Sequence, residues 1–186
     1  GPPRSGRSTA LLVMAGSLVD RGCELVVVTP RQSPLRSLAG RPGVLGVLTG
    51  TLAGERDVLS LLDSALGPAA VLVDDAELLV DAPAAAAFET VLRDGRDGQR
   101  ALVLAGTTSE LASGYRGFVV EARKSRSGLL LTPEHPADGE LLGIRPSRSA
   151  VGPAPKGRGL LVTRGEYRPV QVPLPPPTAS GPPASR

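Results

Sequence analysis

Gly1-Pro2-Pro3-Arg4-Ser5-Gly6-Arg7-Ser8-Thr9 is the stretch that decides the fold, and it follows the pattern G-x-x-x-x-G-R-S. This pattern differs at one position from G-x-x-x-x-G-K-[ST], a loop that cradles phosphates with its backbone amides. Glycines let those amides approach phosphate oxygens, and the helix that follows directs its positive end at the same anion. We therefore expect residues 1–9 to bind the phosphates of a nucleotide, with the Ser8 hydroxyl as a ligand of Mg²⁺.

A short apolar run ending in two acids, Val71-Leu72-Val73-Asp74-Asp75, supplies the second half of such a site. In an open α/β sheet, ligands lie at the carboxyl ends of the strands, where this run delivers its acids. We expect Asp74 to hold Mg²⁺ opposite Ser8, through water. The alternative is a glycine-rich turn and an unrelated acidic strand end.

Two departures from the usual pattern concern turnover. Arg7 stands where lysine is usual, and a planar guanidinium is not equivalent to an ammonium. Asp75 stands where a glutamate usually orients the attacking water, and its side chain is one methylene shorter. Because a misplacement of about 1 Å can cost on the order of 100-fold in rate, we expect binding to survive and fast hydrolysis to be lost.

Apolar runs alternate with helical patterns, which predicts an α/β domain with a mainly parallel sheet. A strand usually precedes a loop of this kind, and we expect that first strand to be missing from the fragment. The 44–49 strand contains Gly46 and is expected at an edge. Strands are predicted at 24–29, 44–49, 70–73, 101–105 and 128–132, with helices at 8–21, 34–39, 55–66, 83–94 and 109–125.

The C-terminal part has a different composition. Residues 159–163 and 170–172 are predicted to pair as a hairpin across Arg164-Gly165-Glu166. The nucleotide-binding module is expected to span 1–172, followed by a proline-rich, disordered tail at 173–186.

Composition limits the classes of protein that this chain can represent. The 186 residues suit one domain, and the single cysteine excludes an internal disulfide. No apolar run reaches the roughly 18–20 residues of a membrane helix. The net charge of +3 is too small to indicate nucleic-acid binding on its own.

Other polar residues have two interpretations each. Thr107 follows the 101–105 strand, where a polar side chain can touch the terminal phosphate or the attacking water; helix capping by Thr108 or Ser109 is the preferred of the two interpretations. Arg158 lies in a Gly-flanked turn and is either an arginine finger toward a neighbouring module or an ordinary turn residue. Arg123 and Arg126 are interpreted as a solvated face rather than a nucleic-acid patch.

These stretches together resemble modules of the FtsK/SpoIIIE family of P-loop ATPases. The resemblance is closest to the degenerate C-terminal modules of EccC-type proteins of type VII secretion and of related multi-domain FtsK-like proteins. It extends over nearly the whole chain except the tail. The matching stretches are residues 1–9, 71–79, 101–111, 127–133, 138–143 and 157–173.

The resemblance implies a RecA-like fold, ATP and Mg²⁺ as cofactors, and neighbouring ATPase modules of the same chain or ring as partners. It also implies a translocase that moves double-stranded DNA or small helical secretion substrates. Such a module is cytoplasmic and tethered to the membrane through other parts of its parent protein, without membrane contact of its own. An interaction module that docks a protein without turning over nucleotide is the alternative.

Overall fold

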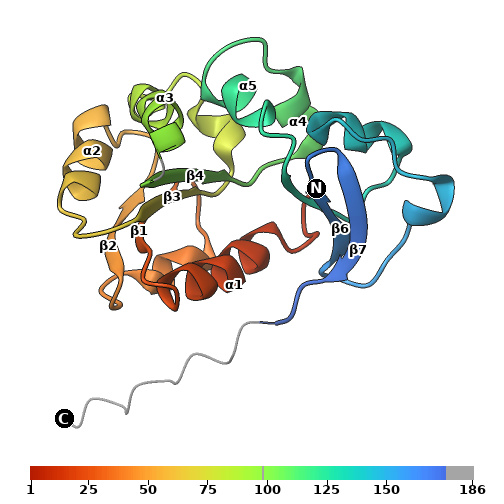
Figure 1. The fold of residues 1–186 in the computed structure, drawn as a ribbon, viewed down its shortest axis with the longest axis horizontal. Coiled ribbons are helices and arrows are strands. Elements are labelled where there is room, and N and C mark those ends of the chain that lie inside the picture. Colours follow the sequence, from red (N-terminus) through yellow and green to blue (C-terminus); the bar gives the residue numbers. More distant parts are fainter. Residues whose placement is uncertain (98, 175–186) are drawn as a thin grey trace, which may run out of the picture.

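A four-stranded parallel sheet forms the centre of the computed structural model, which describes residues 1–97 and 99–174 (Figure 1). Its strand order is β2-β1-β3-β4, and every neighbouring pair is parallel. The predicted tail lies outside the described residues except for its first two. The strands are β1 (Glu24–Thr29), β2 (Val44–Thr49), β3 (Ala69–Val73) and β4 (Arg100–Leu104).

Helices cover both faces of this sheet, as strands that are apolar on both sides require. One face packs against α1 (Arg7–Val19) and the 3-10 helix η1 (Pro34–Leu38). The other packs against α2 (Glu55–Asp63), α3 (Ala85–Asp94) and α5 (Phe118–Arg123). The buried rings of Phe88 and Phe118 meet edge to face in this second layer, with centroids 4.9 Å apart.

The predicted parallel α/β architecture is confirmed. The strand with Gly46 lies at the edge of the sheet, as expected. Ser33 begins the short helix η1, and its hydroxyl accepts a hydrogen bond from the Leu35 amide at 3.3 Å.

The single helix predicted over 109–125 is wrong. Two short helices occupy this stretch, α4 (Thr108–Ser113) and α5, and the chain turns between them at Gly114 and Gly117. Gly117 has a φ of 81°, which lies in the left-handed region and ends helical geometry. Tyr115 is 97% exposed at this turn.

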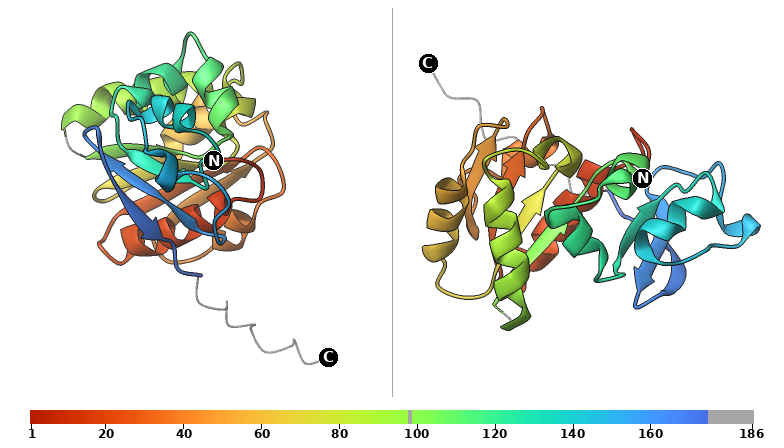
Figure 2. Two further views of the ribbon diagram at one scale, coloured as in Figure 1. Left: turned by 90° about the vertical axis from the view of Figure 1, so that its right-hand side faces the viewer. Right: turned by 90° about the horizontal axis from the view of Figure 1, so that it is seen from above.

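A second, antiparallel sheet lies beside the first (Figure 1 and Figure 2). It consists of β5 (Gly128–Leu131), β6 (Arg158–Thr163) and β7 (Glu166–Gln171). The predicted hairpin is confirmed as β6 and β7, which turn at Arg164 and Gly165 with φ of 52° and 86°. β5 was expected as a core strand of the parallel sheet, but it pairs with β6 instead.

Short 3-10 helices complete the described chain: η2 (Ala76–Leu79), η3 (Gly95–Asp97), η4 (Pro136–Leu142) and η5 (Arg148–Ala150). No helix in residues 1–97 or 99–174 is long and apolar enough to span a bilayer.

Candidate functional site

The loop of residues 1–6 leads into α1 at the carboxyl edge of the parallel sheet (Figure 1). Gly6 precedes the helix with a φ of 99°, and its carbonyl accepts the first helical hydrogen bond from Ala10 at 2.8 Å. Arg4 also has a positive φ of 66°. This sharp turn directs the amino end of α1, with its unpaired amides, toward the ends of β3 and β4.

The remaining residues of the predicted loop make the following contacts. The Ser5 amide donates to the Pro2 carbonyl at 3.3 Å, which closes the loop. The Ser5 side chain is buried, and its hydroxyl has no partner among the described residues. Pro3 lies in the same loop, and Thr9 lies in the first turn of α1.

Ser8 and Asp74 meet directly, although 66 residues separate them in sequence. The Ser8 hydroxyl donates to Asp74 Oδ2 at 2.7 Å, and the Ser33 hydroxyl donates to the same oxygen at 2.7 Å. Asp74 is only 2% exposed, and its Oδ1 has no hydrogen-bond partner in the part of the chain that the structure describes. A buried carboxylate oxygen without a partner fits a cation or its water, so the residues present suit Mg²⁺.

Arg7 is held by three side chains at the ends of β3 and β4. Its Nη1 donates to Thr107 Oγ1 at 2.9 Å, and its Nη2 donates to Asp75 Oδ1 at 3.2 Å. The same guanidinium lies 3.6 Å from Glu77 Oε1. We call this group, formed by Arg7, Asp75, Glu77 and Thr107, the arginine clamp.

Glu77 is the member of the clamp that sequence reasoning missed. Its Oε1 accepts from both the amide and the hydroxyl of Thr107, at 3.1 and 3.0 Å. Its Oε2 packs against Gly106, where any side chain would collide with it. The available signals were a third acid two residues beyond Asp75 and a glycine directly after β4.

Asp75 lies in left-handed backbone geometry, with φ 47° and ψ 51°. Aspartate tolerates this region better than most residues. Burial, followed by the negative charge of Asp74, raises the pKa of the Asp75 carboxyl, against the lowering effect of Arg7. The Asp75 carboxylate thus lies among other negative charges and accepts a hydrogen bond from Arg7.

Thr107 belongs to this site rather than to a helix cap. It is the residue before α4, but its side chain makes no capping hydrogen bond. The hydroxyl instead accepts from Arg7 and donates to Glu77. The alternative of capping by Thr108 or Ser109 is wrong, because α4 already begins at Thr108.

The predicted basic residues lie elsewhere. The exposed Arg158 begins β6, and its Nε donates to Gln171 Oε1 at 3.2 Å. The Gly157 amide just before it adjoins the loop, 3.9 Å from where a Cβ on Gly6 would lie. Arg123 donates to the Ala112 carbonyl at 3.0 Å, so this guanidinium stabilises the end of α4.

A glycine loop before a helix, with an acid from the adjoining strand meeting the loop's serine, defines the P-loop NTPase class of fold. Neither a family model nor a curated protein matches the sequence. Solved structures do match: ATPases 2 and 3 of EssC from Geobacillus thermodenitrificans have a TM-score of 0.72 at 16% identity over 94% of this chain. The cytoplasmic domain of EssC has a TM-score of 0.75 at 15% identity, again over 94% of this chain.

A third structure, described as an ATPase, has a TM-score of 0.64 at 18% identity over 95% of this chain and 78% of its own. The chain spans 36% and 38% of the two EssC structures. The resemblance to EccC-type ATPase modules is thus confirmed at the level of fold. At these identities the similarity establishes the fold alone, so the chemistry of the site is argued from the residues described above.

Proposed function

We propose that this domain is an ATP-binding, non-hydrolysing module of a multi-domain translocase of the FtsK/SpoIIIE type. The observation that supports binding is the Ser8–Asp74 pair, 2.7 Å apart, beside a buried Asp74 oxygen without a described partner. Ser8 and Asp74 would hold Mg²⁺, and the amides of residues 4–8 would receive the phosphates. When bound, Mg²⁺ would neutralise phosphate charge next to three carboxyl groups.

The arginine clamp supports the absence of turnover. A hydrolytic site needs a carboxylate positioned to orient water, whereas Asp75 accepts a hydrogen bond from Arg7. Glu77, the next acid, accepts from Thr107 through Oε1, while its Oε2 is buried beside Gly106 without a hydrogen-bond partner among the described residues. We therefore propose that neither acid activates water and that Thr107 positions Arg7 rather than an attacking water.

Titration calorimetry tests this proposal directly. Mg²⁺-ATP should bind the 186-residue chain, and binding should weaken at least about tenfold in Ser8→Ala, because one interaction with a charged group contributes about 1.5 kcal/mol or more. Ser17→Ala is the matched control, since Ser17 is an exposed serine of the same helix. Chelation of Mg²⁺ should have the same effect as Ser8→Ala.

Phosphate release measures turnover in the same samples. We expect background rates, well below the roughly 1 s⁻¹ at the lower end of typical enzymes. Turnover near that value would contradict the proposal. The double change Arg7→Lys with Asp75→Glu is expected to raise the rate.

A second candidate, an interaction module that docks a protein without binding nucleotide, is favoured by the charges of the clamp. The Arg7 guanidinium is engaged by Asp75 and Glu77, and the carboxyl group of Asp74 meets Ser8, so the site has little positive charge to offer a phosphate. Absence of heat from Mg²⁺-ATP at millimolar concentration, with Ser8→Ala unchanged, would decide for this candidate.

For partners, we propose neighbouring ATPase modules of the same chain or ring and a small helical secretion substrate. Double-stranded DNA is the alternative partner. The protein substrate is preferred because the net charge is only +3 and aromatic residues are 2% of the chain. We propose a cytoplasmic location, with membrane tethering through other parts of the parent protein.

A further inference from the structure

Ser33 makes a contact that its place at the start of η1 does not require. Its hydroxyl caps η1 by accepting from the Leu35 amide at 3.3 Å. The same hydroxyl donates its one proton to Asp74 Oδ2 at 2.7 Å, although 41 residues separate the two in sequence. Capping uses a lone pair of the oxygen and leaves the direction of the proton free. The acceptor of that proton therefore indicates a second role for Ser33.

Asp74 is a buried carboxylate without a cation partner in residues 1–97 and 99–174. It is 2% exposed, and the side chains there that donate to it are those of Ser8 and Ser33, both to Oδ2. A buried carboxylate needs hydrogen bonds or a cation to offset its loss of water. The two hydroxyls therefore determine how this carboxylate is oriented in the nucleotide-free protein.

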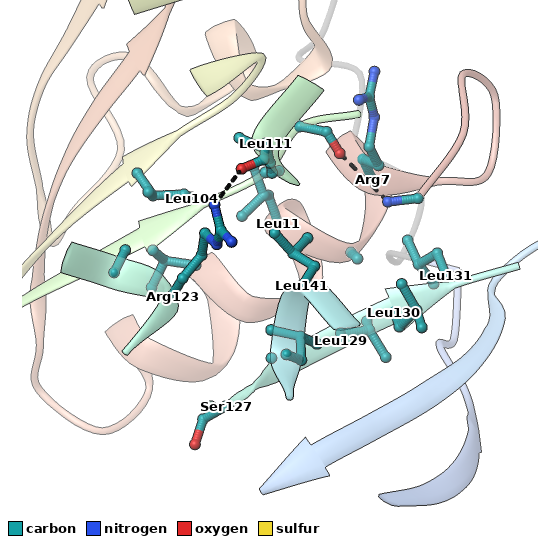
Figure 3. Close-up of a pocket in the computed structure, with 18 of the residues that line it drawn as sticks. Arg7, Leu11, Leu104, Leu111, Arg123, Ser127, Leu129, Leu130, Leu131 and Leu141 are labelled. Atoms are coloured by element: carbon teal, nitrogen blue, oxygen red, sulfur yellow. Dashed lines mark hydrogen bonds between the residues drawn. The ribbon is translucent and has the colours of Figure 1, made fainter. Parts of the chain in front are cut away.

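Arg7 does not take part in holding Asp74. Figure 3 shows Arg7 at the edge of an apolar cleft of about 360 Å³, with its guanidinium directed away from the leucines that line the cleft. That guanidinium donates to Thr107 and Asp75 and pairs with Glu77. The arginine clamp and the contacts of Asp74 with the two serines thus share no side chain.

Ser33 reaches Asp74 because β1 and β3 are neighbours in the sheet. Their register pairs Val28 with Val73, and the Asp74 amide donates to the Val28 carbonyl at 3.1 Å. The chain leaves β1 just after Val28 and returns at Ser33 to the same aspartate, where the fully buried Leu35 fixes η1. Both the main chain and the side chain of Asp74 are therefore attached to one segment.

The Arg36 side chain fixes the loop that carries Ser33. Its Nε donates to Thr29 Oγ1 at 3.3 Å, and its Nη1 donates to Gln32 Oε1 at 2.7 Å. Its Nη2 donates to the Arg31 carbonyl at 3.0 Å. These bonds join η1 to the end of β1 across the loop, so the Ser33 hydroxyl is held in place before any ligand binds.

We propose that Ser33 is a positioning residue for the divalent cation of the nucleotide site. By donating to Oδ2, it fixes the Asp74 carboxylate so that Oδ1, which has no partner in the described chain, remains for the cation or its water. Hydrogen bonds to a metal-binding carboxylate orient it, and their loss typically weakens metal binding by about 10–100-fold. The inference rests on the proposed function, because Ser8 and Asp74 are the cation site of that function.

The Mg²⁺ dependence of ATP binding tests this role. Calorimetry gives the ATP affinity of the 186-residue chain over a series of Mg²⁺ concentrations and in EDTA. Ser33→Ala should raise the Mg²⁺ concentration for half-maximal binding at least about tenfold. It should leave the ATP affinity in EDTA unchanged, because Ser33 holds the carboxylate rather than the nucleotide.

Two further variants separate the hydroxyl from its place in the helix. Ser33→Thr keeps the hydroxyl and should keep the Mg²⁺ dependence of the parent. Ser37→Ala is the matched control, since Ser37 is an exposed serine of η1 whose hydroxyl donates to the Pro34 carbonyl at 2.9 Å. If Ser33→Ala does not fold, Ser33→Gly replaces it, because glycine is an accepted N-cap residue without a hydroxyl.

A merely structural role gives a different result. Ser33→Ala would then unfold at a lower urea concentration while its Mg²⁺ dependence stayed that of the parent. That result contradicts the proposal and leaves the proposed function intact, provided that the parent binds Mg²⁺-ATP. Equal weakening with Mg²⁺ and in EDTA also contradicts it, because the variant would then have damaged the phosphate loop.

Binding of Mn²⁺ alone, followed by water proton relaxation, decides the matter without nucleotide. If the parent binds no Mg²⁺-ATP, the proposed function fails, and Mn²⁺ then tests Ser33 separately. Binding that is lost in Asp74→Asn and weakened at least about tenfold in Ser33→Ala supports the positioning role. No Mn²⁺ binding at millimolar concentration, or equal binding in the parent and Ser33→Ala, overturns it.

Discussion

Replacing Arg7 by alanine should destabilise the protein even without nucleotide. A loop cation that serves phosphate alone has no partners in the empty site and can be removed without cost to folding. Arg7 instead donates to Thr107 and Asp75 and pairs with Glu77. Stability in nucleotide-free buffer therefore reports directly on the arginine clamp.

The magnitude follows from the contacts and their burial. The side chains of Arg7, Asp75 and Glu77 are 15%, 18% and 10% exposed, so solvent screens them little. Hydrogen bonds to charged groups contribute about 1.5–3 kcal/mol each, and those sharing one guanidinium do not add fully. The change also leaves two carboxylates beside Asp74 without their cation. We expect a loss of about 2–4 kcal/mol, or about 5–15 °C in Tm for a domain of this size.

Urea unfolding followed by circular dichroism measures this loss. Arg93→Ala is the control, because the Arg93 side chain is 72% exposed and its pair with Asp94 is 3.9 Å long. That change should stay within about 0.5 kcal/mol. Adding Asp75→Asn and Glu77→Gln to Arg7→Ala should restore at least half of the loss. If Arg7→Ala costs no more than Arg93→Ala, the clamp does not stabilise the fold.

Three further predictions concern the same chain. The folded pKa of Asp75 is raised, so its contribution to stability is present at low pH and lost as pH rises through that pKa. Asp75→Asn should therefore gain stability relative to the parent as pH rises from the ordinary aspartate pKa of about 4, and an unchanged difference would contradict this. Phe88→Ala should cost about 3–5 kcal/mol in urea unfolding, since a buried ring and its contact with Phe118 are lost; a cost below 1 kcal/mol would mean that the site collapses. Binding to a mixed-sequence DNA duplex should be weak. The preference for a protein partner would be overturned by strong binding that is lost in the double variant Arg123→Ala with Arg126→Ala. The affinity of such binding should fall by about 0.9 log units per log unit of salt concentration for each phosphate contact.

Local patterns were sufficient for the strands and their turns. The run at 24–29 is a strand with the predicted bounds, because β-branched residues closed by Pro30 specify both its type and its end. Arg164-Gly165 marks the hairpin because two successive positive φ angles are needed there. Such features depend on residues that are neighbours in sequence, so they can be predicted from one sequence.

Features that depend on contacts between residues far apart in sequence could not be predicted from the sequence. Apolar spacing over 109–125 suits one helix, but the chain turns at Gly114 and Gly117, and this turn places Phe118 of α5 against Phe88. The run at 128–131 is equally suited to a parallel or an antiparallel neighbour, and β6, which decides the matter, lies about 30 residues later. Sequence periodicity identifies a strand but not the strand that pairs with it.

The arginine clamp explains the departure at position 7 in terms of its partners. An ammonium is a compact point charge, whereas the planar fork of a guanidinium reaches Thr107 through one nitrogen and Asp75 through another. A site with a third acid at Glu77 gains more from this fork than from lysine, because two carboxylates and a hydroxyl need partners at once. The arginine and the additional acid therefore explain each other, and a residue that looks like a defect in a phosphate loop is a well-partnered part of the folded domain.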